Sequence, residues 1–90
     1  MTMNEKELEK VLKALANKRR VLILKYLKRV GSASVGEIAD SIKLSFKATS
    51  KHLMILLNTD IVEKEQVSLT MLYFLPKTSH PMVAKLLSII

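Results

Sequence analysis

The sequence predicts a mainly helical domain with one small β-hairpin near its C-terminal end. Before residue 60, four stretches each begin with a residue that caps helix N-termini well and continue with apolar residues at helical spacing. After residue 60, two short segments rich in β-branched and large apolar residues flank a polar break. No linker, repeat or low-complexity stretch divides the 90 residues. A single domain of this size buries only a small core, for which self-association is one common remedy.

Two helices are expected in the first 31 residues. Asn4 and Glu7 have the spacing of a capping box at the start of a helix over about 4–16. Asn17 is a good N-cap for a second helix, which Gly31 stops. The apolar residues at helical spacing are Leu8, Val11, Leu12 and Leu15 in the first helix, and Val21, Ile23, Leu24 and Leu27 in the second.

Two further helices are expected between residues 34 and 58. Ser34 and Glu37 form a second capping-box pair before a short helix, and Ser45 caps the next helix after a tight turn at 43–44. This fourth helix spans about 46–58. The inward residues are Ile38, Ala39 and Ile42 in the third helix, and Thr49, Leu53 and Leu56 in the fourth. The opposite side of the fourth helix carries Lys47, Ser50, Lys51 and Met54.

The remaining residues are expected to form a hairpin and a last helix. The strands cover 61–66 and 69–75, and Pro81 suits the first turn of a helix over about 81–90. The resulting order is α-α-α-α-β-β-α. Two short helices joined by a tight turn and followed by a hairpin are typical of a winged helix-turn-helix. We therefore expect residues 1–90 to be a single domain of this fold, with its wing at about 61–75.

The composition favours a polyanionic partner. The net charge is +7, with nine Lys and Arg against three acids in residues 1–30. Nucleic acid is the first candidate, and an anionic membrane surface is the second. The absence of cysteine excludes disulfides and thiolate chemistry. The charged N-terminus does not fit a signal peptide, and no apolar run approaches the ~20 residues of a membrane span, so we expect a soluble, cytoplasmic protein.

Several segments carry a resemblance to a known family. The segment ALANKRRVLILKYL at 14–27, SVGEIADSIKLS at 34–45 and ATSKHLMIL at 48–56 resemble the second, third and recognition helices of ArsR-type winged-helix repressors. Ser50, His52, Leu53 and Leu56 match the S-x-H-L-x-x-L pattern of that recognition helix. The resemblance covers about two thirds of the chain, from 12 to 75. It implies a homodimeric repressor that binds double-stranded DNA.

The sequence departs from the family where some members bind metals. It has no C-V-C-type motif at 37–40, and His80 is the sole histidine near the last helix. We therefore expect no metal and no cofactor, and the nature of any effector stays open. The wing tip at 65–69 lacks the usual glycine and arginines, so we expect the wing to contribute little. Asp60 stands where the family favours glycine, and Asp tolerates the left-handed backbone that this turn needs.

The fourth helix supplies the expected DNA contacts. A helix in the major groove needs short polar and basic side chains on its outer face. The candidates on the fourth helix are Ser45, Phe46, Lys47, Ser50 and Lys51. The two lysines either contact DNA or merely solvate an exposed face. Phe46 either meets a thymine methyl group or packs back on the third helix.

Three residues outside that polar face complete the predicted DNA-binding set. The resemblance implies that His52 braces the recognition helix or touches phosphate. Lys18 and Arg20 are candidates for phosphate contacts near the start of the second helix. The alternative for this basic run is an ordinary solvated face, which we favour for Lys25, Lys28 and Arg29.

The first and last helices are expected to build a homodimer. The last helix has more apolar residues than one face can hide, although the stripe of the first helix has an alternative role as intramolecular core. Two-fold symmetry would place two recognition helices ~34 Å apart on a near-palindromic operator. The expected interface residues are Leu8, Val11, Leu12, Leu15, Met82, Val83, Leu86, Leu87 and Ile90.

A sequence-specific repressor is therefore the favoured function, and a protein-interaction module with only non-specific DNA affinity is the alternative. An apolar wing with Val67, Leu69 and Met71 would suit that second role. An enzyme is disfavoured because neither histidine has a visible nucleophile or carboxylate partner. A membrane-surface role is disfavoured because the last helix lacks a basic face.

Overall fold

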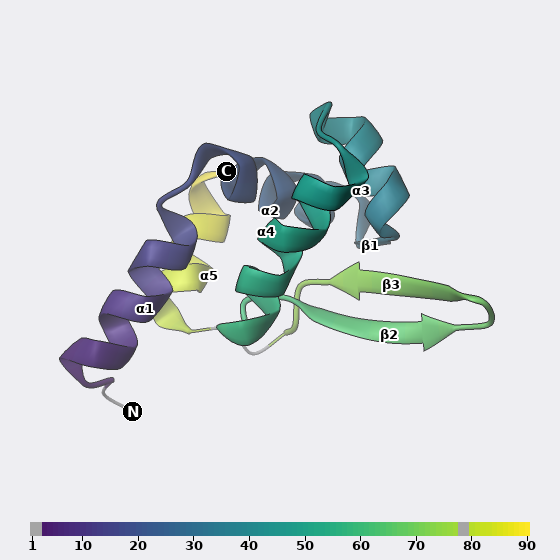
Figure 1. Cartoon of the computed structure of the whole chain (residues 1–90). Helices are drawn as coiled ribbons and strands as arrows, with labels where there is room; N and C mark the ends of the chain where they lie inside the picture. Colours follow the sequence, from purple (N-terminus) through teal and green to yellow (C-terminus); the bar gives the residue numbers. More distant parts are fainter. Residues whose placement is uncertain (1–2, 78–79) are drawn as a thin grey trace.

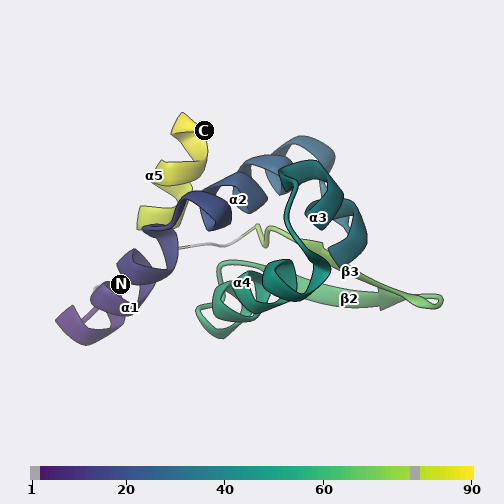
Figure 2. The ribbon, with the colours of Figure 1, turned by 45° about the horizontal axis from the view of Figure 1, so that its top comes forward.

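The computed structural model describes residues 3–77 and 80–90, which form helices and a small antiparallel sheet (Figure 1). The elements are α1 (Glu5–Leu15), α2 (Lys18–Val30), β1 (Ser32–Ala33), α3 (Val35–Ile42), α4 (Phe46–Asn58), β2 (Glu63–Val67), β3 (Thr70–Phe74) and α5 (Pro81–Ile89). The mainly helical fold with a hairpin is confirmed. Both views show α1 and α5 at the end of the molecule opposite the hairpin tip (Figures 1 and 2).

Local capping fixes where the first four helices begin. Their N-cap residues are Asn4, Asn17, Ser34 and Ser45, and each side chain accepts a hydrogen bond from the backbone N–H three residues later. The full reciprocal capping box forms at Ser34 and Glu37, and these hydrogen bonds hold the pKa of the Glu37 carboxyl below its ordinary value. At the first helix the Glu7 carboxylate accepts instead from the Asn4 side-chain amide.

Residues with a left-handed backbone follow the ends of α3 and α4. Lys43 follows α3 at φ 56°, and the next residue, Leu44, donates its N–H to the Ala39 carbonyl at 3.0 Å. Asp60 follows α4 at φ 58°, as expected for a position where glycine is favoured. These two turns set the direction in which the chain enters and leaves α4.

Replacing Asp60 with glycine should stabilise the protein. A non-glycine residue in the left-handed region costs about 1 kcal/mol, and the larger unfolded-state entropy of glycine offsets part of the gain. We expect Asp60→Gly to raise the midpoint of thermal unfolding by a few degrees, as roughly 0.5 kcal/mol does in a domain of this size. Asp40→Gly, at an exposed position inside α3, is the control and should lower it. A lower midpoint for Asp60→Gly would contradict the assigned turn.

The hairpin differs from its predicted bounds at both strands. Ile61 and Val62 were predicted as strand, but both are buried in a turn after α4, and β2 begins at Glu63. The short strand β1 was not predicted, because two residues carry no readable alternation. Ala33 of β1 pairs with Tyr73, which makes β3 the central strand of a sheet ordered β1-β3-β2.

The hydrophobic core is centred on α2, which runs between α5 and α3 (Figure 2). Ile23, Leu24 and Leu27 of α2 are fully buried. On α4, the inward residues Thr49, Leu53 and Leu56 are each 0% exposed, as predicted. This packing holds one face of α4 against the core and leaves the other face outside. None of the helices in the described part of the chain is long and apolar enough to cross a membrane.

Candidate nucleic-acid interface

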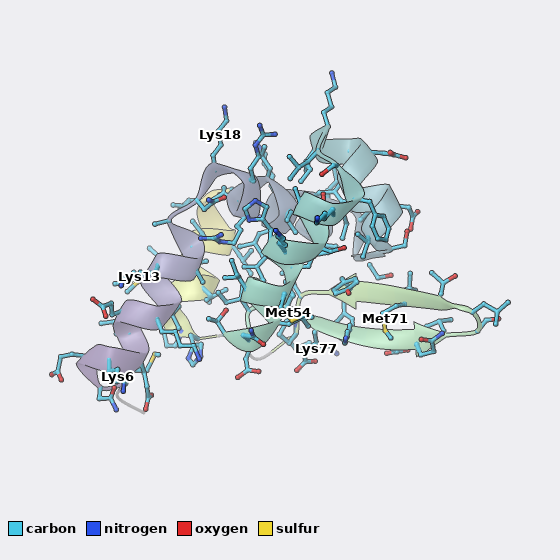
Figure 3. All side chains as sticks on the ribbon, viewed as in Figure 1. Lys6, Lys13, Lys18, Met54, Met71 and Lys77 are labelled. Atoms are coloured by element: carbon cyan, nitrogen blue, oxygen red, sulfur yellow. The ribbon has the colours of Figure 1, made fainter. Side chains whose placement is uncertain are left out.

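The outer face of α4 presents basic and apolar side chains to solvent. Lys47 and Lys51 are exposed one turn apart, and Ser50 between them is partly exposed. Phe46 is 64% exposed, which favours a groove-facing role over packing on α3. Met54, labelled in Figure 3, continues the same face at 55% exposed. The Ser45 hydroxyl accepts the Ala48 N–H at 3.1 Å, so it serves the helix first as a cap.

The electrostatics of α4 suit an anionic partner. The helix contains no acidic residue, and its N-terminus carries the positive end of the helix dipole. In the described residues, the one ion pair between side chains joins Lys13 to Glu9, so neither Lys47 nor Lys51 is neutralised by a carboxylate. The face therefore offers unpaired ammonium groups and a hydroxyl to a polyanion. These are groups that contact phosphates and the acceptor atoms of guanine.

Arg20, a predicted phosphate contact, has its guanidinium bonded within the fold, and its role towards phosphate stays a prediction. Its Nε donates to the Ala14 carbonyl at 2.6 Å, and one terminal nitrogen donates to the Lys13 carbonyl at 3.1 Å. The other terminal nitrogen lies 3.2 Å from Nδ1 of His52. Arg20 thus links carbonyl groups near the C-terminus of α1 to His52 of α4. Sequence reasoning missed this link, which joins residues 32 positions apart.

The contact with Arg20 determines the protonation state of His52. A guanidinium can only donate, so Nδ1 of His52 must be the acceptor and the neutral ring carries its proton on Nε2. Partial burial lowers the pKa of His52, and the positive charges of Arg20 and Arg19 lower it further. The position of the ring fits the bracing role that the resemblance implies.

This lowered pKa predicts a loss of stability in mild acid. Below the ordinary histidine pKa of 6.5, the unfolded chain binds the proton more readily than the folded protein does. The free energy of unfolding should therefore fall as the pH drops from about 7 towards 5, and His52→Gln should flatten this slope. Urea unfolding at several pH values measures it. An equally steep slope in His52→Gln would show that another group is responsible.

Lys18, the other predicted phosphate contact, is exposed to solvent. Lys18 extends from the start of α2 into solvent (Figure 3). It follows Asn17, whose side chain caps the helix. Lys18 is therefore free to meet a phosphate, and its role stays a prediction.

The hairpin has little chemistry for a DNA backbone. All five residues of β2 are exposed, and they include the carboxylates of Glu63 and Glu65. The turn at the tip contains Ser68 at φ 57° and Leu69, which is 96% exposed. Lys64 is the one cation in β2, the tip and β3, and it lies between the two carboxylates, so a small contribution of the hairpin to DNA binding stays a prediction.

The predicted dimer residues on α1 and α5 differ in how much surface they expose in the single chain. Leu12 is 43% and Met82 is 39% exposed. The partly buried residues are Leu8, Leu15, Leu86, Leu87 and Ile90. Val11 and Val83 require correction, because they are 4% and 0% exposed inside the core of the single chain and have almost no surface left for a partner. Ile89, which the predicted set does not include, is 73% exposed.

A shallow apolar hollow marks the outer face of α1. Its volume is about 440 Å³, and Leu8 and Leu12 form its apolar part. Such a hollow on an amphipathic helix suits the side chains of a second apolar surface. Among residues 3–77 and 80–90, no three His, Asp or Glu side chains gather closely enough to hold a metal ion.

The chain is similar in sequence and in structure to bacterial regulatory proteins. Residues 17–64 match the family model described as "Bacterial regulatory protein, arsR family". The transcriptional activator HlyU of Vibrio cholerae is 36% identical over 92 residues, covering 94% of this chain and 84% of HlyU. The structure of reduced HlyU from Vibrio cholerae superimposes with a TM-score of 0.80 at 32% identity, over 96% of this chain and 86% of that one.

A second solved structure is relevant to assembly. The homodimeric winged helix-turn-helix DNA-binding domain Mb0332 of Mycobacterium bovis, described as a possible ArsR-family regulator, has a TM-score of 0.79. The two chains are 28% identical over 93% of this chain and 74% of that one. The fold predicted from the sequence is thus the fold of these relatives.

Proposed function

The chain belongs to the ArsR family of bacterial regulatory proteins, and from this premise we propose that it is a homodimeric, sequence-specific DNA-binding regulator of transcription. The observation that carries the proposal is the acid-free outer face of α4, where Lys47, Ser50 and Lys51 stand unpaired above a fully buried inner face. A helix held in this way fits the major groove.

The proposed roles follow from side-chain chemistry. Lys47 and Lys51 read guanine acceptors or hold phosphates, and Ser50 bonds a base edge or the backbone. Phe46 meets a thymine methyl group. Lys18 adds a phosphate contact that supplies affinity and register without sequence information. His52 is proposed to position the helix through Arg20.

We propose repression as the regulatory outcome, through occupation of an operator that overlaps a promoter. The HlyU relative carries the name of an activator, so the family does not fix the direction of control. The position of the operator relative to the promoter decides between the two. Footprinting on the DNA upstream of the gene should show two related half-sites about 10 bp apart. A single asymmetric footprint, or none, would contradict the dimeric arrangement.

The dimer is proposed to form through the apolar faces of α1 and α5. The Mycobacterium bovis relative is described as homodimeric, and both helices lie at the end of this chain opposite the hairpin tip (Figures 1 and 2). The central residues of this proposed interface are Leu12, Met82 and Ile89, which are apolar and exposed in the single chain.

Leu12→Glu should therefore dissociate the dimer without unfolding the chain. Two-fold symmetry would bury this carboxylate twice, and an unpaired buried charge costs several kcal/mol. We expect the dimer dissociation constant to rise by at least about 100-fold, as sedimentation equilibrium would measure. Leu69→Glu at the hairpin tip is the matched control and should leave the dimer intact. If Leu12→Glu sediments as the parent dimer, α1 is not the interface.

The apolar tip of the hairpin is consistent with a second function, the binding of a protein partner. Leu69 is 96% exposed, which suits a protein-interaction module with only non-specific affinity for DNA. The two functions differ in sequence preference. A protein that binds every duplex equally, while Leu69→Glu removes a protein partner, would favour the second.

A further inference from the structure

A hollow away from the outer face of α4 has the dimensions of a small-molecule site. It lies between the middle of α2, the end of α3 and the end of α5, and its volume is about 500 Å³. This volume falls within the range of ligand pockets, roughly 300–1,000 Å³. Its apolar part is formed by Leu22, Tyr26, Ile42 and Ile90. An apolar ligand body would find matching surface here.

The rim of the same hollow is strongly basic. Four cations surround the apolar part, and the lining contains no Asp or Glu side chain. These rim residues are Lys25, Lys28, Arg29 and Lys43. Among the residues that the structure describes, none of the four forms an ion pair with a carboxylate. Unneutralised cations gathered around an apolar hollow favour an occupant that is anionic at one end.

Two of the rim cations are held in place by the fold. The Lys28 ammonium donates to the Leu87 carbonyl of α5 at 2.6 Å, and the Arg29 guanidinium lies 5.3 Å from the centre of the Tyr26 ring. The contact through Lys28 joins α2 to α5 at the edge of the hollow.

We propose that this hollow binds a small organic anion with an apolar body, such as a medium-chain carboxylate, as an effector. The apolar body covers Leu22 and Ile42, and the carboxylate lies between the ammonium groups of Lys25 and Lys43. Charge-assisted hydrogen bonds orient the anionic end, and the apolar contact supplies selectivity over inorganic anions.

The position of the hollow links it to both proposed surfaces. Ile42 is the last residue of α3 and Lys43 is its C-cap, two residues before Ser45, which caps the recognition helix α4. Ile90 ends the helix that is proposed to join the dimer. A ligand that contacts both the end of α3 and the end of α5 would favour one position of α4 relative to the dimer over another. The affinity for DNA would then change with ligand binding. This coupling rests on the proposed function, whereas the binding itself does not.

Binding is tested on the full chain without DNA. Backbone amide shifts of ¹⁵N-labelled protein are followed by NMR while octanoate, octylammonium or inorganic phosphate is added at constant ionic strength. Octanoate should shift residues around the hollow and bind at least about tenfold more tightly than the other two, the factor that one charge-assisted hydrogen bond supplies. Equal effects of octylammonium or of phosphate would overturn the proposal, as would shifts spread over α1 and the hairpin.

Substitutions at the rim test whether octanoate binds at this hollow. Lys25→Gln with Lys43→Gln should weaken octanoate binding by at least about tenfold, because both ammonium groups are removed. Lys6→Gln with Lys77→Gln is the matched control, since it removes the same charge at exposed positions far from the hollow (Figure 3). Equal weakening in both double variants would reduce the effect to general electrostatics and overturn the site.

The effector role is tested separately on DNA. Saturating octanoate should change the affinity for the operator by at least about fivefold, the lower end of common allosteric coupling. Octanoate that binds at the hollow without changing operator affinity would contradict the effector role. If the protein has no operator, the proposed function is wrong. The NMR test of ligand binding is made without DNA and does not depend on that outcome.

Discussion

The double substitution Lys47→Ala, Lys51→Ala should lower the affinity for the operator by at least about 100-fold and remove the preference for it over other DNA. Each good hydrogen-bonded pairing with a base edge is worth ~1–3 kcal/mol of discrimination, and removing two such pairings together gives that factor. Both side chains are exposed on the outer face of α4, and neither is neutralised by a carboxylate in the described residues. Fluorescence anisotropy with a labelled duplex measures the change.

A matched control separates base recognition from net charge. Lys6→Ala with Lys77→Ala removes two positive charges that do not belong to α4, one in α1 and one after β3 (Figure 3). It should weaken binding to operator and scrambled duplex alike and keep their ratio. Because all four lysines are exposed, both variants should fold as the parent does, which circular dichroism checks. If the two variants lose operator affinity equally, α4 contributes charge alone and the proposed role of its outer face is wrong.

Arg20→Met should lower the free energy of unfolding by about 3 kcal/mol, a large part of the stability of a small domain. The change leaves the carbonyls of Lys13 and Ala14 and the Nδ1 of His52 without their donor. Hydrogen bonds from charged groups contribute ~1.5–3 kcal/mol each, and partial exposure of this cluster reduces the sum because water reaches it. Urea unfolding followed by circular dichroism measures the loss.

Neighbouring substitutions show whether the geometry of the guanidinium matters. Arg19→Met, at an exposed position, should change stability by less than about 0.5 kcal/mol. Arg20→Lys should recover only a part, because one ammonium group cannot reach three acceptors on two helices as the planar fork does. A variant Arg20→Met as stable as Arg19→Met would show that the link between α1 and α4 contributes nothing.

The sequence predicted well where local chemistry decides the structure. Asn17 and Ser45 begin their helices because their side chains satisfy N–H groups only three residues away. The inner face of α4 follows from the spacing of Thr49, Leu53 and Leu56, which a helix of 3.6 residues per turn places on one side. Such signals need no knowledge of the rest of the fold.

Prediction was incomplete where the role of a residue depends on a distant partner. The basic neighbours of Arg20 suggest a phosphate contact, but they give no sign of its acceptors on α1 and on α4. Val83 looked like part of a dimer surface because α5 is apolar on several sides, and only the packed structure shows which side faces the core. Ile61 has strand-like chemistry, yet its N–H bonds to Leu56 at 3.0 Å and closes α4.

A titration of the parent protein against its own upstream DNA and a scrambled duplex of equal length, at two salt concentrations, tests whether the protein reads DNA sequence. We expect binding to the upstream duplex to be at least about 10³-fold tighter than binding to the scrambled one, with the preference retained at the higher salt. Equal, weak binding to both duplexes that disappears with salt would contradict it. In that case the charge of +7 is a general attraction and not part of a sequence-reading surface.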